Sequence, residues 1–555
     1  MNCFCIDREA FTITNYDLNV RVEPEQHRVG VRGRITLRND SQTPQRVAVL
    51  QISFSLDWRA INAGDKPLQF VSQPYSSDVD HTGALSEAVV TLPQAVAPKG
   101  AIDLDIAYEG VIVLDATRLM RIGTPDAAAD SSDWDQISVN FTGVRGAGYV
   151  AWYPIATESA NLSEGDSLFE VLGRWKEREK DARMELSLSF PTIESDVKAP
   201  YIFCDGPSLE MVVKGGSPQW PNAKCSYQTL GTSSPTFVSA SYGFLERSNI
   251  YVYSLPGHDV SATNFADAAE KAAPLIADWF GQPRERARVA DLPDPKAAPF
   301  ESGTLLLTPL ASTDSKLAGL AVAHQLTHAA FQSFRPWIEE GLAHFAQALY
   351  LEHENGRQAA LDYMSLHRSA FVAAEKPAKP EDASNRSLAN TNSEEFYRSK
   401  AMCVWWMLRD MAGDAALKKA LASYHAGQDK EPSYMPRLIA AQTQRDLEWF
   451  FDDWVYRDRG LPDFKIASVF PHKTMTDTYT VTVTVDNLGA AGAEVPVIVK
   501  FAGGEVTKRV EVRGKSKGVV RVEVPAAPRE VVVNDGSVPE SDMTNNVFTV
   551  EAVAQ

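Results

Sequence analysis

The chain has 555 residues, of which 44% are hydrophobic and 23% are charged, and its formal net charge is −18. A single hydrophobic core does not grow to this size, so we expect several domains. The acidic charge argues against a nucleic-acid partner, because phosphates would be repelled, but it does not argue against a peptide substrate. No apolar stretch approaches the ~20 residues that span a bilayer, so the sequence predicts no transmembrane segment.

The first part of the chain has the period-two pattern that is typical of β-strands. Apolar residues alternate with polar ones between residues 16 and 22, between 102 and 108, and between 184 and 190. Turn-forming clusters such as Asn39-Asp40-Ser41 separate these runs. The pattern predicts a large antiparallel β domain, shaped as a saddle or a sandwich, over residues 1–248.

A different pattern begins at about residue 249, where short apolar runs are mixed with helical periodicity. The expected strands are 252–255, 287–289 and 300–307, and the expected helix is 264–280, with Gly281 at its end. Helical periodicity then dominates up to about residue 458. We therefore expect a mainly helical domain over residues 249–462.

Strands return at the end of the chain, separated by Gly-rich turns. Their expected ranges are 480–485, 495–501, 519–524 and 531–533. This spacing predicts a small β-sandwich over residues 463–555. The whole chain is thus expected to be a multidomain α+β protein.

The sequence contains five cysteines. Cys204 and Cys225 flank a loop-rich stretch and could form a disulfide, although spacing alone cannot fix their geometry. Cys403 lies in a strongly apolar helical pattern, which favours an inert buried thiol. The first five residues lack a basic region followed by an apolar stretch, so no signal peptide is predicted in this chain.

The strongest chemical signal is His324-Gln325-Leu326-Thr327-His328. Histidines at i and i+4 lie on one face of a helix and can bind a single zinc ion. Thr313-Asp314-Ser315 is a suitable start for this helix, and Pro336 is well placed to start the next one. The alternative is a pair of core histidines whose ring nitrogens are satisfied by side chains or carbonyl groups.

A carboxylate from the next helix could supply a third ligand and leave a fourth position open. Glu339 and Glu340 compete for this role, although an acidic pair at a helix start is also common as a solvated helix end. Glu340 is favoured because it directly precedes Gly341-Leu342-Ala343. His344, one turn later, could be a fourth ligand, a neighbour of a ligand, or neither.

Several further segments occur in a characteristic order around this motif. These segments are Trp279-Phe280-Gly281, Phe300-Glu301-Ser302-Gly303, Glu340-Gly341-Leu342-Ala343, Tyr397-Arg398-Ser399-Lys400-Ala401, Phe450-Phe451-Asp452-Asp453-Trp454-Val455-Tyr456 and Gly460-Leu461-Pro462. In this order the chain resembles the aminopeptidase N family of membrane alanyl aminopeptidases and leukotriene hydrolases, which are gluzincin zinc metallopeptidases. The last domain resembles an adhesion-type β-sandwich.

The resemblance implies an N-terminal β saddle, a thermolysin-like catalytic domain and hydrolysis of peptide bonds by zinc-bound water. It implies that Zn²⁺ is held by His324, His328 and Glu340, and that Tyr397 hydrogen-bonds the oxyanion. Glu301 is the candidate for the acid that binds a substrate amine, although the rest of that exopeptidase motif is not intact. The expected substrate is a peptide or protein. The sequence does not indicate whether cleavage is exo or endo, and it does not indicate the oligomeric state. An extracytoplasmic location is favoured because adhesion-type sandwiches and a disulfide suit it.

The chain departs from the family in two further ways. The spacing between His328 and Glu340 is shorter than usual, so the connection between the helices must be trimmed. The general-base glutamate is replaced by Gln325, which can orient a water molecule but cannot accept its proton. General acid–base catalysis contributes ~10²–10⁴-fold, so impaired turnover is expected.

The glutamine leaves several interpretations open. It could belong to the natural chain, or it could be the isosteric substitution that disables an enzyme. Another acid such as Glu301 could serve as the base. The competing hypothesis is a pseudoenzyme, a catalytically inactive module that binds zinc or peptide and acts through protein interactions.

Overall fold

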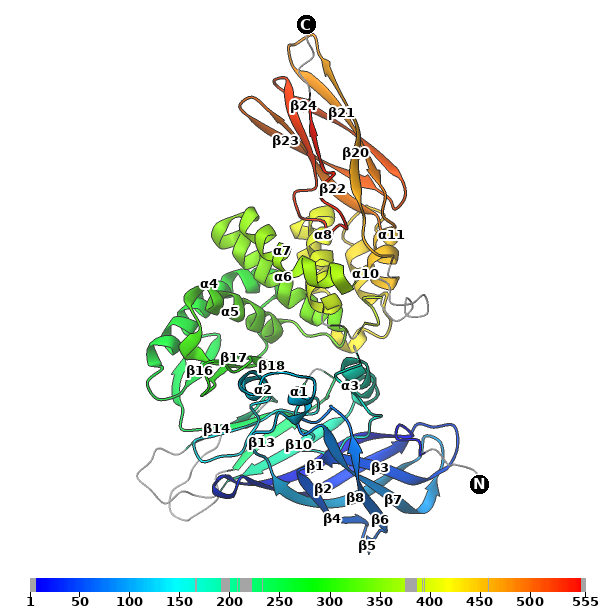
Figure 1. The fold of residues 1–555 in the computed structure, drawn as a ribbon, viewed down its shortest axis with the longest axis vertical. Helices are drawn as coiled ribbons and strands as arrows, with labels where there is room; N and C mark the ends of the chain where they lie inside the picture. Colours follow the sequence, from blue (N-terminus) through cyan, green and yellow to red (C-terminus); the bar gives the residue numbers. More distant parts are fainter. Residues whose placement is uncertain are drawn as a thin grey trace. The chain divides into compact units, whose positions relative to one another are not determined.

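The computed structural model describes residues 6–164, 167–190, 200–206, 208–209, 222–231, 233–374, 387–391, 393, 395–457 and 459–550. In chain order these residues form β-sheets, a helical region and β-sheets again, so the protein is multidomain α+β as expected (Figure 1). The chain divides into two compact units, residues 1–271 with 284–329 and residues 272–283 with 330–555. The predicted domain limits at 248/249 and 462/463 stay predictions.

The first unit contains an eight-stranded sheet in the order β12-β13-β10-β1-β2-β8-β4-β5. Neighbouring strands are antiparallel, except that β1 and β10 run parallel. The alternating residues predicted in β1 all face the core: Tyr16, Leu18, Val20 and Val22 are buried. The strands are β1 Phe11–Glu23, β2 Arg28–Asn39, β4 Leu56–Ala63, β5 Lys66–Pro67, β8 Ala101–Val111, β10 Arg183–Ser189, β12 Ser208–Leu209 and β13 Asn222–Tyr227.

Two three-stranded sheets and several short helices complete this β region. The sheets have the orders β3-β7-β6 and β11-β14-β9. Their strands are β3 Gln45–Ser53, β6 Phe70–Ser76, β7 Ala84–Val96, β9 Phe141–Val144, β11 Tyr201–Cys204 and β14 Phe237–Ala240. The helices are η1 Pro24–Gln26, α1 Thr117–Arg121, α2 Asp126–Ser132 and α3 Ser167–Glu179.

A five-stranded sheet with the order β15-β16-β17-β19-β18 precedes the histidine helix. Its central strands β16, β17 and β19 are parallel, and the edge strands β15 and β18 are antiparallel to their neighbours. The strands are β15 Gly243–Glu246, β16 Ile250–Ser254, β17 Ala287–Asp291, β18 Phe300–Ser302 and β19 Leu305–Thr308. The helices in this part are α4 Asp259–Phe280, η2 Leu310–Ser312 and α5 Ser315–Ala330.

One prediction for this region was wrong. The single strand expected at 300–307 is a hairpin of β18 and β19, in which Ser302 pairs with Leu305. Gly303 has φ +54°, a left-handed conformation that residues with a side chain rarely adopt. The chain therefore turns at Gly303-Thr304, and Glu301 lies on the edge strand of the sheet.

The second unit begins with helices. Pro336 occupies the start of α6 as predicted. The helical elements are α6 Pro336–Asn355, α7 Arg357–Ala374, the π-helical turn η4 Glu395–Lys400, α8 Ala401–Ala412, α9 Asp414–Ala422, η5 Ala426–Gln428, α10 Tyr434–Ala440, α11 Glu448–Phe451 and the π-helical turn η6 Asp452–Tyr456.

The chain ends in two sheets, β20-β21-β24 and β23-β22-β25-β26. Strands of one sheet contact strands of the other, and valines of β21, β22 and β24 are buried between them, which is the predicted β-sandwich. The strands are β20 Phe464–Lys473, β21 Tyr479–Asn487, β22 Ala493–Phe501, β23 Gly504–Val512, β24 Lys517–Val524, β25 Pro528–Val533 and β26 Val547–Thr549.

None of the helices in the described part of the chain combines the length and the apolar character that crossing a membrane requires.

Glu179, at the end of α3, is a buried carboxyl group in the core of the β region. It accepts hydrogen bonds from Tyr16 Oη at 2.7 Å and from the backbone N–H of Ile13 at 3.4 Å. Burial nevertheless raises the pKa of Glu179 from 4.5 to about 7. The folded protein therefore holds this proton more tightly than the unfolded chain does.

We expect the stability contributed by protonated Glu179 to be present below pH 4.5 and to be lost as the pH rises towards 7. The variant Glu179→Gln has no such proton to lose. The difference in free energy of unfolding between this variant and the wild type should therefore be more favourable to the variant at pH 8 than at pH 4 by about 3 kcal/mol, at about 1.4 kcal/mol per pKa unit. Urea unfolding of variant and wild type at both pH values measures this difference. The exposed Glu170 of the same helix provides the control variant Glu170→Gln, and equal behaviour of the two variants would contradict the prediction.

Candidate metal centre

Helix α5 brings the two predicted histidines together. The helix begins where expected, because Asp314 Oδ1 accepts a hydrogen bond from the N–H of Leu317 at 2.8 Å and so caps its first turn. His324 and His328 follow one turn apart on the same face, and each is only 5% exposed. Buried imidazole nitrogens need hydrogen-bond or metal partners, so this face of the helix must supply them.

The ring nitrogens of the two histidines face each other. His324 Nε2 and His328 Nε2 are 3.0 Å apart, and the ring centroids are 4.8 Å apart. Glu301 adds an oxygen from β18, since its Oε2 lies 3.0 Å from His324 Nε2. The ligand atoms of these three residues lie within 4.8 Å of one another.

These separations fit a metal ion of the zinc type. In a tetrahedral site with bonds of about 2.0–2.2 Å, neighbouring ligand atoms are about 3.3–3.6 Å apart. Imidazole nitrogen and carboxylate oxygen are both donors that zinc accepts. Within the first unit, Glu301, His324 and His328 thus bring together a carboxylate oxygen and two imidazole nitrogens that could hold a metal ion.

Gln325 is fully buried next to His324 and contacts the same carboxylate. Its Nε2 donates a hydrogen bond of 2.7 Å to Glu301 Oε2. The side chain therefore acts as a donor to a neighbouring acid, which a glutamate at this position could not do. A carboxylate at 325 would instead repel Glu301.

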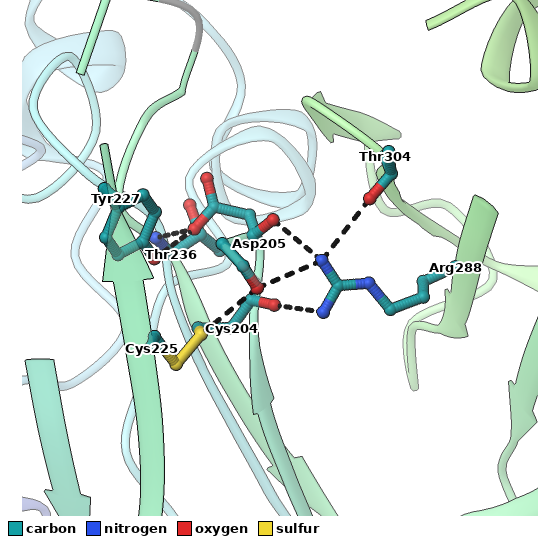
Figure 2. Close-up of a disulfide and its surroundings, with 8 residues drawn as sticks. Cys204, Asp205, Cys225, Tyr227, Thr236, Arg288 and Thr304 are labelled. Atoms are coloured by element: carbon teal, nitrogen blue, oxygen red, sulfur yellow. Dashed lines mark hydrogen bonds between the residues drawn. A yellow bond between two sulfur atoms is a disulfide. The ribbon is translucent and has the colours of Figure 1, made fainter. Parts of the chain in front are cut away.

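Glu301 is held in place by the residue that follows it. Ser302 Oγ donates to the buried Asp205 Oδ2 at 2.6 Å. The other oxygen of Asp205 accepts from Tyr227 Oη at 2.5 Å and from the N–H of Thr236 at 2.9 Å (Figure 2). Burial raises the pKa of Asp205, and these donors oppose that shift.

The segment that carries Asp205 is itself fixed on two sides. Cys204 and Cys225 form a disulfide, so the pairing that the sequence left open is present. The buried Arg288 of β17 donates to the carbonyl oxygens of Cys204 at 2.6 Å and Asp205 at 2.7 Å (Figure 2). It also contacts Thr304 Oγ1 at 3.4 Å, so one guanidinium connects this segment to the turn after β18.

The two acidic candidates on α6 have different surroundings. Glu339 Oε2 accepts a hydrogen bond from the N–H of Ser333, which lies before the helix. Glu340 Oε2 lies 3.4 Å from Arg398 Nε, and its side chain is 19% exposed. Arg398 directly follows Tyr397 in the π-helical turn η4.

His344 has a different neighbour. Its ring lies 5.6 Å from the ring of His367 on α7, centroid to centroid. His367 Nδ1 is 3.1 Å from Ser399 Oγ, and burial lowers the pKa of His367. Within the described part of the chain, the group that could hold a metal does not include His344.

The contacts around Glu301 could not be predicted from the sequence. The family resemblance suggested an amine-binding role for this residue and said nothing of its bond to Gln325. The sequence analysis did not single out Asp205, and it named Ser302 only as part of the segment Phe300-Glu301-Ser302-Gly303. Asp205 follows a cysteine and Ser302 follows Glu301, but the bond between them joins segments 97 residues apart, and no local pattern encodes it.

Among the comparisons with known proteins, only the one with solved structures found matches. No protein-family model matches the chain, and no curated protein matches it. Two solved structures, the M1 zinc metallopeptidase from Deinococcus radiodurans and a mutant of it, each share 17% sequence identity with this chain at a TM-score of 0.48. The alignments cover 82% of this chain and 95% and 96% of theirs.

Removing the hydroxyl group of Ser302 (Ser302→Ala) should destabilise the first unit. The buried Asp205 would lose the donor to its Oδ2, and a buried polar atom without its partner costs about 1–3 kcal/mol. Urea unfolding followed by tryptophan fluorescence measures the change. The matched control is Ser248→Ala at an exposed position. A midpoint equal to that of this control would show that the Ser302–Asp205 bond contributes nothing.

Proposed function

We propose that this chain is a zinc metallopeptidase-like protein that acts on peptides with impaired turnover. In this proposal His324, His328 and Glu340 hold the ion. The observation that carries the proposal is the 3.0 Å approach of two buried imidazole Nε2 atoms on one helix. Two imidazole nitrogens that converge with a carboxylate oxygen of Glu301 at these distances match the donor set of a divalent cation such as zinc.

Glu340 is proposed as the carboxylate ligand rather than Glu339. The carboxylate of Glu339 is engaged by the backbone N–H of Ser333. The carboxylate of Glu340 is paired with Arg398 at 3.4 Å. Such an outer partner orients a ligand and tunes its basicity.

Each proposed site residue would have its own role in the hydrolysis of the peptide bond. A bound zinc ion would polarise the scissile carbonyl group and acidify water. Tyr397 would donate a hydrogen bond to the oxygen on which negative charge develops, where a directed donor has most effect. Gln325 would hold Glu301 and orient polar groups, but its amide cannot take up a proton. The loss of a general base reduces turnover by ~10²–10⁴-fold.

The second candidate function is a pseudopeptidase that binds zinc or peptide and works through protein interactions. The observation in its favour is again Gln325, because its side-chain amide donates a hydrogen bond to the carboxylate of Glu301 and cannot accept a proton from water. The two functions share the metal site and differ in turnover. The experiments below therefore separate metal binding from hydrolysis.

Zinc content tests the site directly. We expect the purified chain to hold a single zinc ion, and expect zinc to be lost from variants that lack a ligand: His324→Ala, His328→Ala and Glu340→Ala. Atomic emission after removal of loosely bound metal measures the stoichiometry. His353→Ala, which changes an exposed histidine of α6, is the control. Absence of zinc from the wild type would overturn the proposed metal site and, with it, the proposed peptidase function.

Hydrolysis then separates the two functions. Restoring the carboxylate (Gln325→Glu) should raise peptide turnover by ~10²–10⁴-fold, whereas removal of the oxyanion donor (Tyr397→Phe) in that background should lower it again. A mixed peptide library analysed by mass spectrometry measures both rates and shows whether cleavage is exo or endo. The control is Gln94→Glu at an exposed position of β7.

Stoichiometric zinc without peptide turnover, both in the wild type and in Gln325→Glu, would favour the pseudopeptidase. Turnover that is equal in Gln325→Glu and wild type would show that position 325 does not limit the reaction.

A further inference from the structure

The position of Glu301 has a consequence for the coordination of the proposed ion. In a catalytic zinc site, three protein ligands leave the fourth position to water or substrate, whereas a structural site is closed by four protein ligands. We infer that Glu301 occupies the fourth coordination position in the resting protein and that Gln325 holds it there. This inference rests on the proposed metal site and concerns how that site is regulated.

The geometry for this role lies within the first unit. Glu301 Oε2 is 3.0 Å from His324 Nε2, and His324 Nε2 is 3.0 Å from His328 Nε2. The carboxylate oxygen therefore lies directly beside the nitrogen that would bind the ion. The separation of 3.0 Å is within about half an ångström of the spacing between neighbouring ligand atoms in a tetrahedral zinc site. The position of the oxygen is therefore that expected of a fourth ligand.

Gln325 provides the means to hold the carboxylate. Its Nε2 donates to the same oxygen, Glu301 Oε2, at 2.7 Å, and its side chain is buried. A carboxylate oxygen has lone pairs for both a hydrogen-bond donor and a metal ion. The glutamine thus has a role that a glutamate could not fill, since two carboxylates at this distance repel each other.

The backbone of Glu301 is anchored while its side chain remains accessible. Ser302, the next residue, is bonded to the buried Asp205. The side chain of Glu301 itself is 25% exposed. An external ligand can therefore reach the carboxylate and compete with it, so the site would open only when a ligand displaces Glu301.

The test compares variants that release the fourth position. Glu301→Ala removes the carboxylate, and Gln325→Met removes the donor while keeping the side-chain volume. The exposed Glu285 provides the control Glu285→Gln. Circular dichroism and thermal unfolding confirm that each variant folds, and zinc content confirms that each is loaded.

Two measurements report on the ion without using catalysis. Competition with a chromophoric chelator should show zinc bound about 10- to 100-fold more weakly by Glu301→Ala than by the wild type, as expected for loss of a coordinating or supporting carboxylate. The visible spectrum of the Co²⁺-substituted protein should change when water replaces Glu301. Gln325→Met should shift both readouts in the same direction by a smaller amount.

A small chelating ligand tests whether the position is closed. Acetohydroxamic acid should bind the Co²⁺-substituted Glu301→Ala at least about 10-fold more tightly than the wild type, because no side chain must be displaced. The same spectrum follows this binding.

The outcomes separate this inference from the proposed function. If the wild type binds no zinc, both fail. If the wild type binds zinc but Glu301→Ala has the same zinc affinity, the same Co²⁺ spectrum and the same affinity for acetohydroxamic acid, the inference about Glu301 alone fails. Agreement of all three readouts with expectation supports a closed resting site.

Discussion

The candidate metal centre depends on the 3.0 Å approach of two buried imidazole nitrogens on a largely apolar helix. Burying polar groups is unfavourable unless they have partners. The fold meets this demand by bringing an edge strand up to the helix, so that Glu301 reaches His324. The turn at Gly303 and the bond from Ser302 to the buried Asp205 fix the backbone next to that carboxylate.

The contacts around Gln325 bear on its proposed role. By sequence alone, the glutamine is interpreted as the replacement of a general base. Viewed with Glu301, it is a donor matched to an acceptor, and the pair behaves as a unit. The chemistry of the site is therefore decided by two positions, 301 and 325, and substitutions at either one are not expected to act independently.

Local features were the ones that the sequence could predict. The cap at Asp314, the proline that starts α6 and the histidine pair on one face depend only on neighbours within a few residues. The strand prediction at 300–307 failed because an apolar run does not reveal a two-residue turn. The strand β23 was also overlooked, since its charged residues, such as Lys508 and Arg509, suit an exposed edge and mask the alternation. The bond between Gln325 and Glu301 depends on the register of β18 and on the bond between Ser302 and Asp205, which are distant in sequence. No local pattern could therefore predict it.

The parallel pairing of β1 with β10 bears on the order in which the molecule can form. Asn15 lies opposite Arg183, and β1 occupies the middle of the eight-stranded sheet. During synthesis, the backbone groups on one side of β1 remain without their pairing strand until β10 has left the ribosome. Contacts between residues so far apart in sequence slow folding, and β1 presents an unpaired strand edge until they form. Nascent chains cut before residue 190 are thus expected to be the aggregation-prone form of this protein.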